Sequence, residues 1–168
     1  MNLKDHPRFA NIRFFANRYK WLDISSIETC ARMHLLTSEL AAAFDAHFAR
    51  HDLSRGRFFI LLILMRAGDQ NLSPAEIADN CEVSRATITG LLDTLQSAGF
   101  IEREASVEDR RAVRVRLTEA GKAHLESMLP DHYKRITRLM QGLTQEDRAT
   151  LNALLDKIAD GIPAMRDL

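Results

Sequence analysis

Hydrophobic and polar positions follow a helical period along most of the chain. From Ser25 onward, apolar residues recur at intervals of three and four positions, which is the pattern of amphipathic helices. The segment Ser25-Ser26-Ile27-Glu28 matches a capping box, so a long helix is expected to begin there. Ser54 is expected to cap the next helix. Segment 58–65 of that helix is apolar on every side, which predicts that it is buried all round.

Two further helices are expected in the C-terminal third. Thr118 is predicted to open a helix that continues to about Leu139, and Thr144 is predicted to open the last helix. Pro130 lies inside the first of these helices. Because its ring clashes with the preceding turn, a kink or a split is expected there. The last helix carries an apolar row at helical spacing, which consists of Leu151, Leu154, Leu155 and Ile158.

The stretch 73–117 carries the most explicit local signals in the chain. Ser73-Pro74-Ala75-Glu76 is a second capping box, with proline at the first helical position, and it predicts a short helix. Ser84 is predicted to be the N-cap of a longer helix, whose apolar residues fall at i, i+3, i+4 and i+7. Gly99 then supplies a residue that can take the left-handed conformation beyond the helix end. The apolar residues of the longer helix are Ile88, Leu91, Leu92 and Leu95.

A β-hairpin is expected directly after this pair of helices. Residues 100–104 form one short run, and residues 113–117 alternate apolar and basic positions with the period of a half-buried strand. The polar connection 105–112 carries Asp109-Arg110-Arg111 at its tip. Helix, turn, helix and hairpin in this order describe a winged helix-turn-helix. The expected fold class is therefore mainly α, with a small β-hairpin wing; the resemblance described below adds a helical dimerisation region.

This order of elements predicts a surface that reads duplex DNA. Short side chains near the N-terminus of a helix let its backbone enter the major groove. Arginines at a hairpin tip suit a narrow minor groove, and a neighbouring aspartate can hold one guanidinium in a bidentate geometry. An ordinary amphipathic helix and a solvated turn would explain the same residues without DNA. The candidate contacts are Ser84, Arg85, Ala86, Thr87, Thr89 and Gly90 on the helix, Asp109, Arg110 and Arg111 on the wing, and Ser73 and Arg55 for the DNA backbone.

These segments resemble the MarR family of bacterial transcriptional regulators, over about residues 35–168. The resemblance implies a homodimer joined through its N- and C-terminal helices, with one winged helix per subunit and often a small-molecule pocket. It aligns residues 84–90 with the family's recognition helix, and Asp109 and Arg111 with its wing motif. Gly90 departs from the family pattern, in which a basic residue is common. The resemblance rests on Leu53-Ser54, Arg57-Phe58, 72–78, 83–89, Leu95, 98–103, 109–111 and 117–121.

Composition fits one compact unit with three regions. The chain has 168 residues, of which 46% are hydrophobic and 27% charged, so a globular protein with a substantial core is expected. Residues 1–24 are an N-terminal extension, 25–52 and 118–168 the helical dimerisation region, and 53–117 the winged helix-turn-helix. No apolar segment approaches membrane-spanning length, and the N-terminus opens no signal-peptide core. Cys30 and Cys81 form no paired motif, so reduced thiols and a cytoplasmic location are expected.

Net charge initially argues against a DNA-binding protein. The whole chain is neutral, and residues 73–117 hold six arginines against eight acidic residues, a net charge of −2. Affinity for DNA depends on local neutralisation of phosphates, so the placement of the arginines matters more than their sum. Four of the six lie between residues 110 and 116. A dimer would double their number, and binding should weaken steeply with salt.

A ligand pocket is expected beside the helix-turn-helix. A histidine among phenylalanines can offer a polar handle within an apolar cavity, as in many small-molecule sites. An aromatic acid would suit it, with the ring on a phenylalanine and the carboxylate on a charged histidine or a nearby arginine. A filled core explains the same residues almost as well. The predicted pocket residues are Phe44, His47, Phe48, Phe58 and Phe59.

Several other interpretations stay open at this stage. A thiol-based redox sensor would use Cys30, and a winged helix can also serve as a protein-docking module. The basic and aromatic residues of 1–24 suit an arm that packs on the partner subunit, or less readily one that touches nucleic acid. His47 and His51, four residues apart, are interpreted as surface or groove-lining side chains rather than metal ligands. Spacing reveals no catalytic arrangement, so neither an enzyme nor a cofactor is expected.

Overall fold

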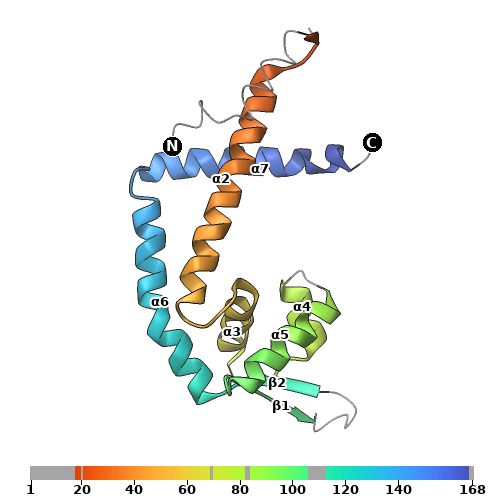
Figure 1. Cartoon of the computed structure of the whole chain (residues 1–168), viewed down its shortest axis with the longest axis vertical. Helices are drawn as coiled ribbons and strands as arrows, with labels where there is room; N and C mark the ends of the chain where they lie inside the picture. Colours follow the sequence, from red (N-terminus) through yellow and green to blue (C-terminus); the bar gives the residue numbers. More distant parts are fainter. Residues whose placement is uncertain (1–17, 20, 69, 82–83, 106–112, 167–168) are drawn as a thin grey trace. The chain divides into compact units, whose positions relative to one another are not determined.

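The structure is a computed structural model that describes residues 18–19, 21–68, 70–81, 84–105 and 113–166. The chain forms two compact units, residues 1–122 and 123–168, and each is described by itself. The first unit contains helices α2 (Ile24–Ala49), α3 (Arg55–Ala67), α4 (Pro74–Cys81) and α5 (Arg85–Ser97) (Figure 1). It also contains strands β1 (Ile101–Ala105) and β2 (Val113–Leu117) and the first turn of α6 (Glu119–Leu139). The second unit holds the rest of α6, then α7 (Gln145–Gly161) and a short 3-10 helix, η2 (Ile162–Met165).

The N-cap of α2 differs from the sequence prediction. Asp23, not Ser25, caps this helix: its carboxylate accepts the Ser26 N–H at 3.2 Å and the Ser26 hydroxyl at 2.5 Å. The two hydrogen bonds hold the pKa of Asp23 below its ordinary value. A carboxylate at this position also complements the positive end of the helix dipole, which favours Asp23 over the serines that follow it.

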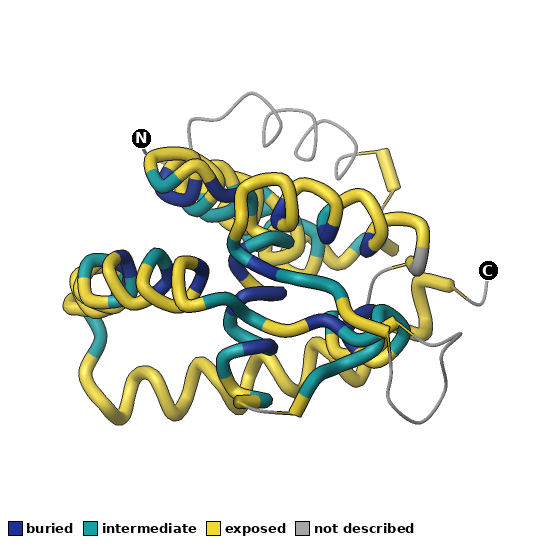
Figure 2. The backbone as a smooth tube through the Cα atoms, turned by 90° about the horizontal axis from the view of Figure 1, so that it is seen from below, coloured by how far each residue is buried: buried dark blue, intermediate teal, exposed yellow. Residues whose placement is uncertain are grey.

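The core of the first unit lies between α3, α4, α5 and the hairpin. Figure 2 marks the buried residues in dark blue along the backbone. Helix α3 is not buried all round, contrary to the sequence prediction: Phe59 is 48% exposed, whereas its neighbour Phe58 is 2% exposed. The buried apolar residues of this unit are Phe48, Leu53, Phe58, Ile60, Leu61, Leu64, Ile77, Ala78, Ile88, Leu92, Leu95, Ile101 and Val115.

The hairpin predicted after α5 is present. Strands β1 and β2 pair antiparallel, with Ile101 opposite Leu117 and Ala105 opposite Val113. Leu72, just before α4, also pairs with β2, through Val115. Its N–H donates to the carbonyl of Val115 at 3.1 Å and its carbonyl accepts the Val115 N–H at 2.8 Å. The residue that precedes the helix-turn-helix is thereby tied to the wing.

Two glycines shape the junctions on either side of the hairpin. Gly99 has φ of 74°, so it takes the left-handed conformation expected beyond the end of α5. Gly121 lies in the first turn of α6, where a Cβ would collide with the carbonyl of Phe100. The same carbonyl accepts the Thr118 N–H at 3.0 Å. Only a residue without a side chain permits this close approach of α6 to the start of the hairpin.

The second unit is built from long helices. Helix α6 runs unbroken through Pro130, so the proline does not split it. Thr144 caps α7 as predicted, in a reciprocal capping box with Asp147: the Thr144 hydroxyl accepts the Asp147 N–H at 3.1 Å and Asp147 accepts the Thr144 N–H at 2.8 Å. The apolar row of α7 is exposed along its whole length. Its members are Leu151, Leu154, Leu155 and Ile158, continued by Ile162 in η2.

Candidate DNA-binding surface

The start of α5 is fixed by Ser84. The Ser84 hydroxyl accepts the Thr87 N–H at 3.2 Å and lies 2.8 Å from the Thr87 hydroxyl. Ile88, Leu92 and Leu95 anchor the opposite side of the helix in the core. This packing leaves the small side chains at the N-terminal end of α5 in solvent. The exposed positions are Ser84, Ala86, Thr87, Thr89 and Gly90.

Helix α4 is held by a capping box that also joins it to the wing. The Ser73 hydroxyl accepts the Glu76 N–H at 3.2 Å, and the Glu76 carboxylate accepts the Ser73 N–H at 2.7 Å. The same carboxylate accepts Arg114 of β2 at 2.9 Å, and Arg114 also donates to the carbonyl of Asn71 at 3.3 Å. The hydrogen bond from the Ser73 backbone, followed by that from its hydroxyl, lowers the pKa of Glu76. Ser73, predicted to contact the DNA backbone, thus has a capping role in the protein.

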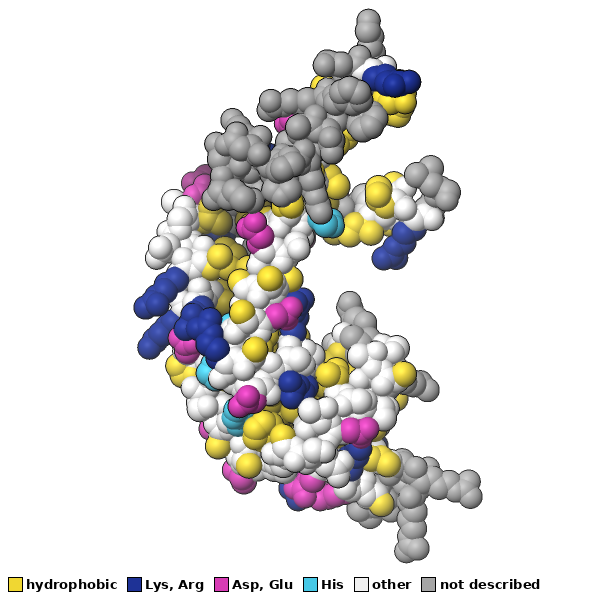
Figure 3. Space-filling view, in the orientation of Figure 1, with side chains coloured by type: hydrophobic (Ala, Val, Ile, Leu, Met, Phe, Trp, Pro, Cys, Tyr) yellow, Lys and Arg dark blue, Asp and Glu magenta, His cyan; other side chains and the backbone are white. Residues whose placement is uncertain are grey.

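Ion pairs within the winged helix account for part of its acidic excess. Arg103 of β1 pairs with Asp93 of α5 at 2.6 Å, and Arg114 pairs with Glu76. Figure 3 shows acidic and basic side chains next to one another over this unit. Cross-strand contacts add a further pairing, in which Arg116 meets Glu102 at 2.6 Å and Glu104 at 2.8 Å. These three arginines therefore orient α4, α5 and the strands, and they offset three of the four negative charges of their acidic partners.

The remaining arginines of the motif are the candidates for DNA contact. Asp109, Arg110 and Arg111 lie outside the described residues, as does the side chain of Arg85. Their predicted roles stay predictions. Since the ion-paired arginines serve within the fold, phosphate neutralisation by this motif would depend on Arg85, Arg110 and Arg111.

Arg55, the other predicted contact to the DNA backbone, is engaged by α2. Its Nη2 donates to both carboxylate oxygens of Asp45 at 2.9 Å and to the carbonyl of Ala41 at 3.4 Å. The bidentate geometry fixes the guanidinium at the start of α3. Arg55 therefore joins α2 to α3.

The predicted ligand residues occupy two different surroundings. His47, Phe48 and Phe58 are buried, and the rings of Phe48 and Phe58 lie 4.6 Å apart between centroids. The predicted location of His47 at the surface or in a groove is wrong, because it is 4% exposed; its ring lies 5.3 Å from that of His51. Phe44 is half-buried and stacks with Phe48 at 6.1 Å. Phe59 lies at the surface, on the edge of this aromatic cluster.

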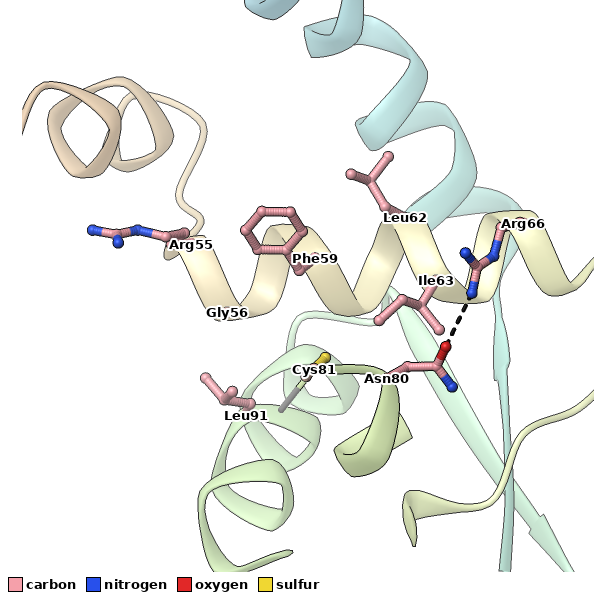
Figure 4. Close-up of a pocket in the computed structure, with 9 residues that line it drawn as sticks. All are labelled: Arg55, Gly56, Phe59, Leu62, Ile63, Arg66, Asn80, Cys81 and Leu91. Atoms are coloured by element: carbon pink, nitrogen blue, oxygen red, sulfur yellow. Dashed lines mark hydrogen bonds between the residues drawn. The ribbon is translucent and has the colours of Figure 1, made fainter. Parts of the chain in front are cut away.

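A pocket opens beside Phe59, which is one of its lining residues; the other four predicted pocket residues do not line it. It has a volume of about 750 Å³ and lies between α3, the end of α4 and α5. Figure 4 shows the side chains that line it. The apolar helix face flanked by arginines at both ends was the only sign of it in the sequence. The lining residues that sequence reasoning missed include Leu62, Ile63, Arg66, Asn80, Cys81 and Leu91.

The two cysteines differ in their surroundings. Cys30 is exposed on α2, whereas Cys81 is half-buried at the end of α4. Burial raises the pKa of the Cys81 thiol, so this side chain is uncharged at neutral pH. None of the described helices is both long enough and apolar enough to cross a membrane.

The fold and the exposed end of α5 define a winged helix-turn-helix protein of the DNA-binding class. Comparison with known proteins agrees. A family model described as "MarR family" matches residues 53–113. The chain is 34% identical over 167 residues to the HTH-type transcriptional repressor YetL of Bacillus subtilis, covering 99% of this chain and all of that protein. The chain belongs to the MarR family of transcriptional regulators, whose members here are regulators rather than enzymes.

Solved structures show the same architecture. A single-site mutant of Escherichia coli MarR in complex with operator DNA is 26% identical, with a TM-score of 0.68, and the match covers 80% of this chain and 95% of that one. Bordetella bronchiseptica BpsR, whose structure concerns regulation of its DNA binding by 6-hydroxynicotinic acid, is 25% identical with a TM-score of 0.64. That match covers 76% of this chain and 91% of BpsR. The predicted family, fold class and regulatory function are confirmed.

Proposed function

We propose that the chain acts as a homodimeric repressor that binds a pseudo-palindromic operator in double-stranded DNA and is released by a small aromatic acid. Helix α5 carries the DNA part of the proposal. Its polar N-terminal end is exposed and small, while Ile88, Leu92 and Leu95 fix its other side in the core. This is the arrangement by which a helix enters a major groove. A cytoplasmic location follows from DNA as the target.

The apolar row of α7 supports self-association. Leu151, Leu154, Leu155 and Ile158 lie on one side of the helix, at 39–50% exposure. A continuous apolar stripe on a capped helix suits helix–helix packing, with a second copy of this chain as its partner. A two-fold dimer then presents two α5 helices to DNA, about one helical turn or a multiple of it apart.

Two relatives support repression and release. YetL is named a transcriptional repressor, and DNA binding by BpsR is regulated by 6-hydroxynicotinic acid, an aromatic acid. For release, the ligand must bind the form of the protein that does not hold DNA more tightly than the form that does. An aromatic acid that bound both forms with equal affinity would leave the DNA complex intact.

Selection of bound sequences from random duplex DNA, followed by footprinting, tests the DNA-binding part. The selected sites should show dyad symmetry with half-sites about 10 bp apart or a multiple of that spacing. Affinity should fall steeply as salt rises, because phosphate contacts release counterions. Protection without dyad symmetry, or binding by a strict monomer, would contradict the proposed dimer. Failure to select any sequence would favour a protein-docking module.

Two substitutions separate base reading from positioning on DNA. Arg85→Ala should relax the preference at one base pair, at a cost of about 1–3 kcal/mol if the guanidinium reads guanine. Arg111→Ala should weaken binding to many sequences alike, because a wing arginine responds to groove shape and potential. Binding measurements on the selected operator and its single-base variants compare the two. Equal and sequence-independent losses would show that Arg85 does not read a base.

A thiol-based response is the second candidate, because Cys30 is exposed and so accessible to oxidants. In that case peroxide should release DNA from the natural protein and not from a Cys30→Ser variant. Release of both proteins alike, or of neither, would exclude a sensor that depends on Cys30.

A further inference from the structure

The exposed end of α5 presents methyl groups to solvent. At about 100° per residue, Ala86 and Gly90 lie on the side of the helix opposite the buried Ile88. Thr87 and Thr89 flank this ridge, one on each side, and all four positions are exposed. Alanine offers one methyl, each threonine offers another, and glycine offers no side chain. The solvent-facing side chains described in this segment are therefore short and carry methyl groups.

Threonine hydroxyls of α5 form hydrogen bonds within the protein. The Thr87 hydroxyl lies 2.8 Å from that of Ser84, whose oxygen also accepts the Thr87 N–H at 3.2 Å. Further along the helix, the Thr94 hydroxyl donates to the carbonyl of Gly90 at 2.9 Å. These contacts turn both oxygens toward the helix itself. The methyl group of each threonine is then the part that it offers to another molecule.

The Thr87 methyl is held in a fixed direction. A β-branched side chain has few χ1 rotamers in a helix, and the hydrogen bond to Ser84 selects one of them for Thr87. On the other side of the helix, Ile88, Leu92 and Leu95 are at most 1% exposed, so α5 is fixed in the core. A contact group that is ordered before binding loses little conformational entropy when it meets its target. Thr87 is therefore prepared for a close apolar contact.

Base edges in the major groove differ in the chemistry that they require. Adenine is read by amide side chains, guanine by arginine or lysine, and cytosine by carboxylates, whereas thymine offers a C5-methyl group to apolar contacts. Among the described side chains at positions 84–90, none carries an amide or a charge. The chemistry at the start of α5 thus matches the methyl group of thymine, which 5-methylcytosine carries at the same ring position.

Asp93 is the carboxylate of α5 that could read cytosine instead. Its Oδ1 accepts a hydrogen bond from Arg103 of β1 at 2.6 Å, and this ion pair offsets its charge. Asp93 also lies in the middle of the helix, beyond the N-terminal residues that meet base edges when a recognition helix docks. It therefore joins β1 to α5, and contact with bases is left to the residues before it.

We propose that α5 reads the C5-methyl group of a pyrimidine in the major groove, through the methyl groups of Thr87 and Thr89. Each half-site then carries thymine, or 5-methylcytosine in its place, beneath the start of α5. The contact demands a close approach of the helix to the base edge, which the short side chain of Ala86 on the same face permits. The inference rests on the proposed binding of a pseudo-palindromic operator and names the base chemistry that this site selects.

Replacement of thymine by deoxyuridine in the selected operator tests the methyl group alone, because uracil keeps the base pair and its O4 acceptor. Each thymine is replaced at symmetric positions of both half-sites, and affinity is measured by fluorescence anisotropy. Loss of one buried methyl should weaken binding about fourfold per half-site, or about fifteenfold for the pair. One or two positions per half-site should show this loss, and the other thymines little change. An operator selected from unmethylated DNA that lacked thymine in its half-sites, or that tolerated every deoxyuridine, would overturn the inference.

A second selection, from random DNA in which every cytosine is C5-methylated, separates the two sources of the methyl group. Thymine at the sensitive position in both selections would assign thymine as the base that is read. Methylated cytosine there in the second selection would assign the methyl group itself, whichever pyrimidine carries it. In that case 5-methylcytosine should bind more tightly than cytosine at the sensitive position, by the same factor of about four per half-site.

Thr87→Ser and Thr89→Ser remove the methyl groups of the protein and keep the hydroxyls. Each should weaken binding to the thymine operator about fourfold per half-site, and should have little effect on the deoxyuridine operator, because the partner methyl is already absent. Thr94→Ser, on the same helix with its hydroxyl on the Gly90 carbonyl, is the matched control and should leave both affinities nearly unchanged. Coupling at one threonine alone would assign the contact to that residue. Equal losses on both operators, for both variants, would show that the threonines do not meet the pyrimidine methyl and would overturn the inference.

Failure of this inference and failure of the proposed function give different results. If the natural protein selects a dyad-symmetric operator that is insensitive to deoxyuridine, methyl reading is wrong and the proposed repressor stands. If the natural protein selects no sequence at all, the proposed function is wrong.

Discussion

Gly90 leaves an open position on the exposed side of α5. A Cβ added there would meet nothing within 4 Å, and the residue is helical, so no positive φ requires glycine. A glycine inside a helix costs about 1 kcal/mol relative to alanine. The position is therefore open to a longer, basic side chain that could reach toward DNA.

Gly90→Arg should therefore strengthen DNA binding. Each added phosphate contact should steepen the dependence of log affinity on log salt by about 0.9, and a dimer adds two such contacts. Binding titrations of the operator at several salt concentrations measure the slope. Gly142→Arg, also at an open position but outside the winged helix, is the matched control. An unchanged slope would mean that position 90 does not approach a phosphate.

The Glu76 carboxylate connects pH to stability. Its folded pKa lies below the ordinary value of 4.5 because the Ser73 backbone, the Ser73 hydroxyl and Arg114 all favour the charged form. The lowered pKa adds to the free energy of unfolding. This contribution is complete at pH values above the pKa of the unfolded chain, and it is lost as the pH falls through the pKa of the folded protein.

Glu76→Gln should consequently destabilise the protein at neutral pH and make little difference in strong acid. Glutamine keeps a capping acceptor but loses the charge that meets Arg114. Denaturant unfolding of both proteins between pH 7 and pH 3 gives the comparison. A stability difference that stayed constant below pH 4 would show that the ionised carboxylate is not its source.

At the scale of elements, helix caps could be predicted from the sequence, because a cap joins residues only three positions apart. Ser73, Ser84 and Thr144 all cap the helices predicted for them. Asp23 was missed because a serine pair that fits the same motif, Ser25-Ser26, begins two residues later. The open face of α3 was not predictable, since periodicity shows which residues are apolar but not which neighbours cover them.

The ion pairs of the winged helix could not be predicted from the sequence either. The partners of Arg103 and Arg114 lie 10 and 38 residues away. Only the packing of the hairpin against α4 and α5 brings these charges together. The net charge of −2 in residues 73–117 therefore misrepresented the motif, because a sum over the sequence does not distinguish arginines used within the fold from those free to meet DNA.

The junction between β1 and α6 should be intolerant of any side chain. Gly121→Ala would bring a Cβ against the Phe100 carbonyl, and backbone cannot move aside as a flexible side chain can. Overpacking of this kind costs about 1–3 kcal/mol, which corresponds to a fall of several degrees in Tm. Gly142→Ala, with nothing within 4 Å, should leave Tm within about a degree or raise it. Thermal unfolding followed by circular dichroism compares the two, and equal Tm values would show that α6 can shift at no cost.

At the scale of the whole molecule, the proposed dimer depends on the exposed apolar row of α7. Leu154→Glu places a charge in the middle of its apolar row and should convert the dimer into monomers at micromolar concentration, because the carboxylate would be buried without a partner. Ala153→Glu adds the same charge outside that row. Sedimentation velocity measures the state of each variant. Dimers that persist in Leu154→Glu would exclude this row as the dimerisation surface.

The hydrogen bonds between Leu72 and Val115 also affect how the protein opens. Leu72, just before α4, forms a β-bridge with Val115 of β2. Strand β2 therefore cannot move away from this segment without breaking the hydrogen bonds that hold the start of the helix-turn-helix. Local opening of the hairpin and of the segment before α4 should then occur together. The amides of Leu72 and Val115 should accordingly show similar protection from hydrogen–deuterium exchange. DNA that immobilised only the tip of the wing would, for the same reason, slow exchange as far away as the first turn of α4.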